Sequence, residues 1–224
     1  MSKLVSKGSW IRRVLLGAIA FFALSGAAYA ADCKSQQKGT EIFADTFADD
    51  SGGWAGGEGS SFGKPALTLT LYTPYVNWLF VNNTFNASDG DYCTEAVLPK
   101  PPSADNLAYV GIVALYKDAD NLLLLQIDNK SDMNLYRKVA GTWSTIGTYP
   151  APSPAPAVGS VVTLRMTVKG TLVTPYVNGV ALKKIRVQLP TGPLKFGVYV
   201  QLGNQVPKPG VDFQFNNYRV TSGE

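Results

Sequence analysis

The sequence contains no histidine among its 224 residues. Histidine-based triads, histidine general bases and histidine-ligated metal sites are therefore excluded for this chain. Cysteine is nearly absent too, with only Cys33 and Cys93. In an oxidising compartment we favour one structural disulfide between them over a reactive or metal-binding thiol pair. Closing a loop of about 60 residues would stabilise the fold by roughly 4 kcal/mol.

The sequence also lacks the motifs of common nucleotide-binding and metal-binding sites. No Gly-rich phosphate-binding loop of the P-loop or dinucleotide-binding type occurs, and no strand-to-helix context exists for one. The chain also lacks a long amphipathic helix and the oxygen-donor pattern of a known calcium loop. We therefore expect no metal and no cofactor.

Residues 1–30 have the three parts of an export signal. A basic start is followed by an apolar stretch at 14–24, and Ala28-Tyr29-Ala30 matches a small-x-small cleavage site. An uncleaved membrane anchor is the alternative, but the apolar stretch is short for a bilayer. The sequence thus predicts a cleaved signal peptide at 1–30, a single domain at 31–224, and a protein secreted to the periplasm or the extracellular space.

The charge balance argues against polyanionic partners. The chain has 20 basic and 16 acidic residues, and residues 1–30 hold four of the basic ones and no acidic one. The remaining chain therefore carries equal numbers of each sign. Without a basic surplus, neither nucleic acid nor an anionic membrane surface is an expected partner, and no stable membrane insertion is expected after cleavage.

The remaining chain reads as short strands separated by turn signals. Residues 107–129 contain two apolar runs around a polar segment at 117–121, which predicts a β-hairpin near the centre of a sheet, covered on both faces. Asn178-Gly179 is the strongest hairpin turn signal, and residues 180–189 are expected to form its returning strand. Roughly a dozen such strands predict an all-β fold, a two-sheet antiparallel sandwich.

Two local features each allow two interpretations. Trp54 stands among glycines. We favour a loop anchor that packs onto the core over an exposed ligand platform. The cluster of Asp118, Asp120 and Asn121 is interpreted as a hairpin turn, with a calcium loop as the alternative.

Several strand-and-turn segments resemble the concanavalin A-like jelly-roll superfamily of lectins and glucanases. They are residues 109–113, Asp120-Asn121, 164–168, 176–179 and 213–220. Laminin G-like domains and the 3-keto-disaccharide hydrolase domain family are nearest in pattern, and the opening residues 43–47 with a downstream Gly-Gly-Trp fit the latter. The resemblance spans most of 40–222 and implies a jelly roll, a fold that hosts lectins, hydrolases and interaction modules alike.

Catalysis by this chain would have to use carboxylates. Glycosidases need two of them across a cleft, and the glucanases of the superfamily carry a Glu-x-Asp-x-(x)-Glu strand motif that this chain lacks. Glu95 and Asp128 are the two carboxylates expected to face a concave sheet, and they are the catalytic pair if the chain is an enzyme. Because scattered carboxylates are more often solvated or ion-paired, we expect no catalysis.

Binding of a neutral sugar needs aromatic faces and a few fixed hydrogen-bonding groups. We expect the polar faces of the central strands to form one concave surface, with Trp78 or Tyr109 as a stacking platform. The alternative for Arg165 and Asp128 is an ion pair on a solvated sheet face. The predicted ligand-binding residues are Trp78, Tyr109, Gln126, Asp128, Arg165, Tyr199 and Gln201.

The leading hypothesis is an exported, non-catalytic module that binds carbohydrate or a cell-envelope glycan. One alternative is a glycoside-acting hydrolase of the 3-keto-disaccharide type that uses Glu95 and Asp128. The other is a protein-interaction module that uses its sheet edges or loops, with a protein as the partner.

Overall fold

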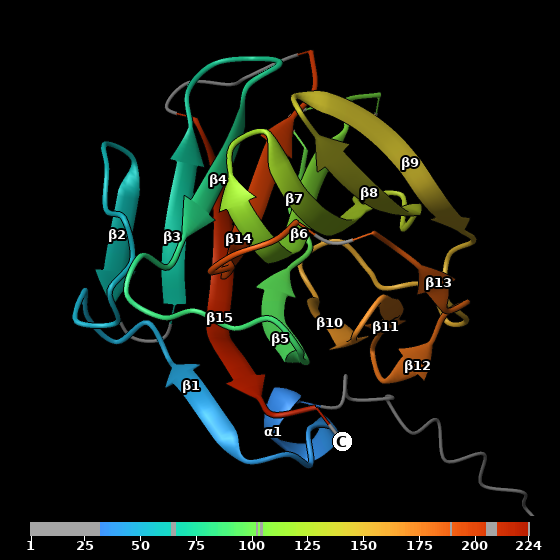
Figure 1. Cartoon of the computed structure of the whole chain (residues 1–224). Helices are drawn as coiled ribbons and strands as arrows, with labels where there is room; N and C mark the ends of the chain where they lie inside the picture. The colour runs from blue at the N-terminus through green and yellow to red at the C-terminus, as the bar shows by residue number, and fades with distance from the viewer. Residues whose placement is uncertain are drawn as a thin grey trace, which may run out of the picture.

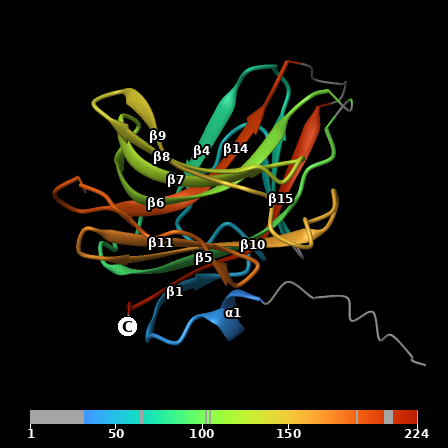
Figure 2. The ribbon, with the colours of Figure 1, turned by 90° about the vertical axis from the view of Figure 1, so that its right-hand side faces the viewer.

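The computed structural model describes residues 32–63, 66–101, 103, 105–188, 190–204 and 210–223. These residues form one four-residue helix and fifteen strands in two antiparallel sheets, stacked as two layers (Figures 1 and 2). The predicted all-β, two-sheet jelly-roll sandwich is confirmed. The expected signal peptide at 1–30 lies outside the described residues. In the described part of the chain, no helix has the length and apolarity to cross a membrane.

The larger sheet is built mostly from the two ends of the chain. Its strands are β1 (Glu41–Asp45), β2 (Ser60–Gly63), β3 (Ala66–Leu71), β5 (Gly90–Val97), β10 (Val161–Lys169), β11 (Leu172–Val177), β12 (Val180–Ala181), β13 (Ile185–Arg186) and β15 (Val211–Thr221). Over the described residues it has nine strands in the order β12-β11-β10-β5-β15-β3-β2, with β1 paired to β15 and β13 paired to β11.

The single returning strand expected over 180–189 is wrong in detail. Two strands of two residues, β12 and β13, take its place along β11, and Leu189 lies outside the described residues. The interruption falls next to Pro175 of β11. Proline has no backbone N–H, so Pro175 cannot donate to the returning segment, although its carbonyl oxygen accepts from the Leu182 N–H at 2.9 Å.

The smaller sheet contains the predicted central hairpin. Its strands are β4 (Asn77–Val81), β6 (Ala108–Asp118), β7 (Asn121–Asp128), β8 (Met133–Val139), β9 (Thr142–Tyr149) and β14 (Lys195–Leu202). Over the described residues the order is β4-β14-β6-β7-β8-β9. The hairpin expected at 107–129 is β6–β7, in the middle of this sheet, and side chains on both of its faces are buried.

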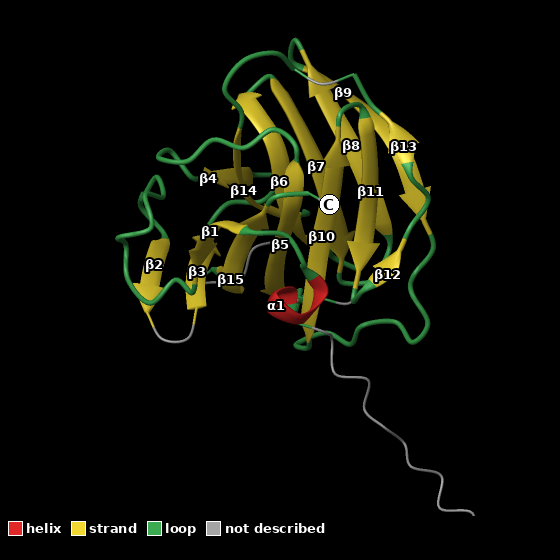
Figure 3. Ribbon diagram, turned by 60° about the horizontal axis from the view of Figure 1, so that its bottom comes forward, coloured by secondary structure: helices red, strands yellow, loops and turns green. Residues whose placement is uncertain are grey.

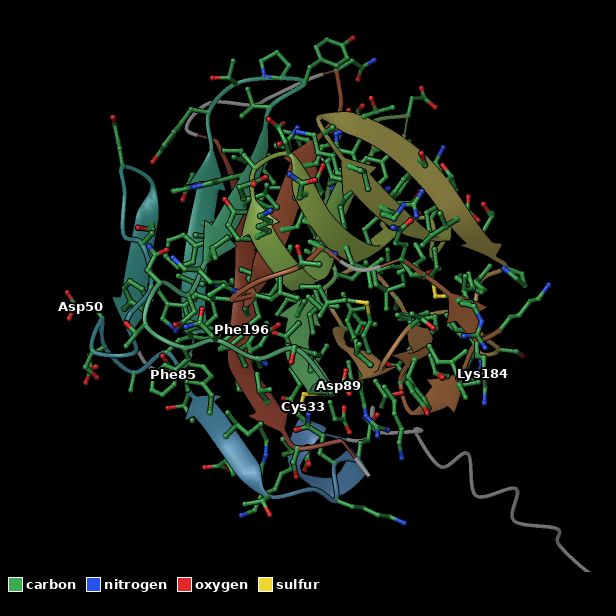
Figure 4. The ribbon with its side chains drawn as sticks, in the orientation of Figure 1. Cys33, Asp50, Phe85, Asp89, Lys184 and Phe196 are labelled. Carbon is green, nitrogen blue, oxygen red and sulfur yellow. A yellow bond between two sulfur atoms is a disulfide. The ribbon has the colours of Figure 1, made fainter. Side chains whose placement is uncertain are left out.

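The core lies between the sheets and is aromatic at one end. Phe196, labelled in Figure 4, stacks on Tyr218 at 5.1 Å between ring centroids and lies equally close to Phe43. Trp54 is 7% exposed and stacks on Phe80 at 5.8 Å. Its indole N–H donates a 2.8 Å hydrogen bond to the Asp45 carboxylate. The interpretation of Trp54 as a buried loop anchor is therefore confirmed.

The helix α1 (Cys33–Gln36) rests on the outer face of the larger sheet (Figure 3). The predicted disulfide joins Cys33 to Cys93 in β5. The backbone N–H of Cys33 also donates to Glu95 Oε1 at 2.9 Å, and Gln37 Nε2 donates to the Asp91 carbonyl oxygen at 2.6 Å. These contacts fix the segment after the disulfide against β5.

Candidate functional site

The outer face of the six-stranded sheet carries the candidate site. Paired residues on neighbouring strands point to the same face. Gly111 of β6 pairs with Tyr199 of β14 and with Gln126 of β7, and Gln126 pairs with Asn134 of β8. This row crosses the centre of the sheet. Figure 2 shows β4 and β14 on one side, and β8 and β9 on the other, rising above β6 and β7.

A groove of about 270 Å³ follows this curved face. Its lining residues are Asn77, Tyr109, Leu124, Gln126, Tyr136, Trp143, Tyr199 and Gln201. Gly111 keeps the centre of the sheet face open. A Cβ atom there would lie 2.7 Å from Leu124 Cδ1 and 2.9 Å from the Leu125 carbonyl oxygen.

The floor and one wall of the groove are apolar or aromatic. Val113, Leu122, Leu124 and Tyr199 form a small buried cluster on this outer face, separate from the main core. The rings of Tyr136 and Trp143 meet edge to face at 6.1 Å between centroids. Flat apolar and aromatic surfaces of this kind pack against the C–H faces of sugar rings.

Most of the residues that line the groove carry a polar group, and one hydrogen bond joins two of these groups. The Tyr199 hydroxyl donates a 2.6 Å hydrogen bond to Gln201 Oε1. Gln126 is 5% exposed and lines the groove. Burial raises the pKa of Tyr199, and burial together with the nearby Asp128 raises that of Tyr109. Both hydroxyls therefore remain neutral donors at physiological pH.

The groove is also uncharged among its described lining residues. Beside it, the Lys138 ammonium group lies 5.4 Å from the centre of the Trp143 ring. Its charge is balanced by Asp120 at 3.2 Å. The described lining of the groove therefore contains no carboxylate.

Four of the predicted binding residues come together here: Tyr109, Gln126, Tyr199 and Gln201. Asp128 pairs with Tyr109 in register but does not line the groove. Its carboxylate instead accepts the backbone N–H groups of Lys130 and Asp132, at 2.8 and 3.0 Å, in the turn after β7.

Trp78 points to the other face of the sheet. It pairs with the core residue Val200, and its ring meets Phe80 edge to face at 5.9 Å. The ring borders a separate depression of about 480 Å³, next to Tyr72. Asn77 borders both this depression and the groove, so the two are adjacent.

The expectation that Arg165 shares this face is wrong. Arg165 is in β10 of the other sheet, where it pairs bidentately with Asp91 at 2.7 and 2.6 Å. The alternative of an ion pair with Asp128 is therefore also incorrect. Alternation along β10 showed which side chains share a strand face, but not which sheet the strand joins.

Glu95 and Asp128 do not converge. Glu95 belongs to β5 and contacts α1 on the outer face of the nine-stranded sheet. Asp128 belongs to β7 and is in register with outer-face residues of the six-stranded sheet. The two carboxylates therefore lie on opposite outer surfaces of the sandwich.

Sequence reasoning missed Asn77, Leu124, Tyr136 and Trp143. The alternation of Asn134, Tyr136 and Lys138 was a usable signal, because pairing Gln126 with Asn134 places Tyr136 on the groove side. The cluster at Asp118 is a turn, as predicted: its carboxylate accepts from the Asp120 N–H and from Asn121 Nδ2. Across the described ranges, no three cysteine or carboxylate side chains are grouped so as to hold a metal ion.

Solved structures with the same architecture include a carbohydrate-binding module, CBM66 from Bacillus subtilis. It matches with a TM-score of 0.59 and 17% identity over 76% of this chain and 96% of its own. The β-glucanase of Bacillus licheniformis gives a TM-score of 0.60 and 15% identity, over 83% of this chain and 100% of its own. The laminarinase catalytic domain of Thermotoga maritima gives a TM-score of 0.62 and 11% identity, over 84% of this chain and 100% of its own. The fold is the concanavalin A-like jelly roll.

At these identities the likeness shows the fold of this jelly roll and not its activity. No family model matches the sequence, and no curated protein matches it. The closer resemblance to the 3-keto-disaccharide hydrolase domain family therefore stays a prediction.

Proposed function

We propose that this jelly roll binds a carbohydrate in the groove of its six-stranded sheet and does not cleave it. The observation that carries the proposal is Gln126, a nearly buried amide that lines the groove together with Tyr109, Tyr136 and Tyr199. Buried polar groups normally have hydrogen-bond partners. A sugar hydroxyl in the groove would supply one, while its ring packs on Tyr109 or Trp143.

The shape of the face favours an oligosaccharide over a single sugar. The groove, at about 270 Å³, is near the lower end of small-molecule sites, which start at about 300 Å³. Asn77 also lines the depression beside Trp78, which lies on the other side of the edge strand β4. A ligand that passes around β4 and spans both would stack on Trp78, the platform expected from the sequence.

Binding without cleavage is supported by the charges. No carboxylate is among the described lining residues of the groove, and the predicted pair, Glu95 and Asp128, lies on opposite surfaces. Glycosidase carboxylates stand about 5 to 10 Å apart across the bond they cleave. A hydrolase of the 3-keto-disaccharide type would need another acidic pair.

We further propose that the protein acts outside the cytoplasm, on a cell-envelope or extracellular glycan. The Cys33–Cys93 disulfide supports this, because such bonds persist in oxidising compartments. The expected signal peptide at 1–30 points the same way. The structural neighbours named for carbohydrate binding and glucan cleavage make a glycan the first ligand to test.

The test is a glycan-array and polysaccharide pull-down with the purified protein, followed by product analysis on every hit. Gln126→Ala is expected to weaken binding about fivefold, because a net hydrogen bond contributes about 1 kcal/mol. The matched control is Gln214→Ala, an exposed glutamine on β15 of the other sheet, which should bind as the native protein does.

Reaction products that require Glu95 or Asp128 would overturn the non-catalytic proposal. If Gln126→Ala binds glycan with the affinity of the native protein, the binding site is not in the groove. If no glycan binds, the proposed function fails, and a protein partner in the envelope becomes the hypothesis to test.

A further inference from the structure

A second cavity lies on the opposite side of the sandwich, over the outer face of β10 and β11. Its volume is about 430 Å³. Arg165, Thr167, Thr174 and Tyr176 form its floor, paired in register as Arg165 with Tyr176 and Thr167 with Thr174. Figure 3 shows α1 to one side of these two strands and β12 and β13 to the other.

The cavity is cationic. Lys38 lines it from the segment after α1, and Lys184, labelled in Figure 4, lines it from the segment between β12 and β13. Lys169 and Arg165 add two more positive charges, against the single described carboxylate of Asp91. In the described part of the chain, neither Lys38 nor Lys184 has a carboxylate within 4.0 Å. Because residues 31–224 carry no net charge, this excess is local.

The floor of the cavity is held in place and carries hydrogen-bond donors that have no partner among the described residues. The Arg165 side chain is 15% exposed, is held by Asp91 through Nε and Nη2, and stacks on the Tyr176 ring at 4.4 Å. These two bonds leave Nη1 available as a donor, and Arg165 lines the cavity. The hydroxyls of Thr167 and Thr174 have no hydrogen-bond partner among the described residues. Fixed donors lower the entropic cost of binding.

The segment after α1, which carries Lys38, is held in place as well. Lys38 follows Cys33 by five residues, and the Cys33–Cys93 disulfide ties that segment to β5. Between them, Gln37 Nε2 donates to the Asp91 carbonyl oxygen at 2.6 Å. Asp91 therefore orients Arg165 on the floor of the cavity and holds Gln37 in the segment that carries Lys38.

We propose that this cavity is a second ligand site, which binds an acidic sugar residue through its carboxylate, sulfate or phosphate group. Lys38 and Lys184 supply the charge, and Arg165 Nη1 with the two threonine hydroxyls supplies directed hydrogen bonds. The cavity exceeds the volume that a lone inorganic anion needs, and its hydroxyl-bearing floor suits a polyol. This site is independent of the groove, which is uncharged and lies on the other face.

The test uses trigalacturonate as the probe, with the uncharged galactose trisaccharide of the same linkage and inorganic sulfate and phosphate as comparisons. Affinity is measured by calorimetry at two salt concentrations, and the site is located by amide chemical shifts. We expect trigalacturonate to shift β10 and β11 and to bind more weakly in high salt, where charges are screened. The double variant Lys38→Gln/Lys184→Gln should weaken binding by at least about tenfold.

The control variant is Lys117→Gln/Lys130→Gln, which removes two exposed lysines far from the cavity and changes the net charge equally. It should bind within about twofold of the native protein. Equal weakening in both double variants would show a non-specific charge effect and overturn the site. The sugar part of the proposal would be overturned if inorganic sulfate or phosphate bound as tightly as trigalacturonate. If trigalacturonate leaves β10 and β11 unshifted, the site itself fails.

The experiments distinguish a wrong assignment of the cavity from a wrong assignment of the groove. The groove is tested with neutral glycans and Gln126→Ala, and the cavity with the acidic probe and the two lysines. Gln126→Ala should leave trigalacturonate affinity unchanged, because Gln126 and the cavity are on opposite faces. A loss of trigalacturonate binding in Gln126→Ala would place the acidic ligand in the groove and overturn the second site.

Discussion

The hydroxyl of Tyr199 donates a 2.6 Å hydrogen bond to Oε1 of Gln201, two residues further along the same face of β14. This bond holds the amide of Gln201, which lines the groove. Tyr199→Phe keeps the ring and removes the bond. We expect glycan affinity to fall about fivefold while the free energy of unfolding drops by only about 1 kcal/mol. Calorimetry and urea denaturation measure the two effects.

Tyr149→Phe is the matched control for that prediction. Its hydroxyl donates to the Lys183 carbonyl oxygen at 3.1 Å, outside the groove. Tyr149→Phe should lower the free energy of unfolding by a similar amount and leave the affinity for glycan unchanged. Equal affinity in native protein and Tyr199→Phe would mean that the Gln201 amide does not contact the ligand.

Gly111 is the second point at which the groove can be tested. An alanine Cβ would come within 2.9 Å of the backbone oxygen of Leu125, which cannot move without shifting β7. Overpacking of this kind typically costs about 1–3 kcal/mol. Gly111→Ala should therefore lower the free energy of unfolding by that amount and weaken glycan binding. In Gly63→Ala, by contrast, the new Cβ meets no atom within 4 Å, and a similar loss there would contradict this explanation.

Asp91 is 5% exposed, and Arg165 is its ion-pair partner. Arg165→Met would leave a buried carboxylate without its counter-charge, which typically costs about 3–5 kcal/mol. Adding Asp91→Asn to that variant should recover much of the loss, because the asparagine carries no charge. A double-mutant cycle on the free energy of unfolding measures this coupling, and additive losses would show that the pair acts independently.

Local signals in the sequence predicted the strands well. The apolar runs at 107–129 and the Asn178-Gly179 turn are short-range features, and the structure has a hairpin at each. The disulfide was predictable because only two cysteines exist. Trp54 was predictable as an anchor, since a large aromatic side chain in a loop usually packs onto the core.

The groove was only half predictable, because it depends on non-local pairing. Alternation placed Trp78 and Phe80 on one strand face correctly, yet nothing local showed that this face turns toward the core. Likewise, Arg165 alternates as expected along β10, but the pairing of β10 with β5 puts it in the other sheet. Trp143 joins the groove because β9 pairs it with Lys138, on the same face of β8 as Tyr136.

Asp128 offers a test by pH. Burial raises the pKa of its carboxyl, and the backbone N–H groups of Asp132 and Lys130 only partly oppose this. The folded state therefore holds the Asp128 proton more tightly than the unfolded state does. As pH rises from the ordinary pKa of an aspartate through this raised value, the native protein loses stability, and the loss persists at pH 7.

Asp128→Asn keeps an oxygen acceptor for both N–H groups and removes the charge. We expect it to be more stable than the native protein at pH 7, with an advantage that shrinks as pH falls through the carboxyl pKa. Asp118→Asn is the control of opposite sign, because hydrogen bonds from Asn121 and Asp120 lower the pKa of Asp118. That variant should be less stable at pH 7. Denaturation at pH 7, 5 and 3 compares them, and a destabilised Asp128→Asn at pH 7 would mean that the charge itself holds the turn after β7.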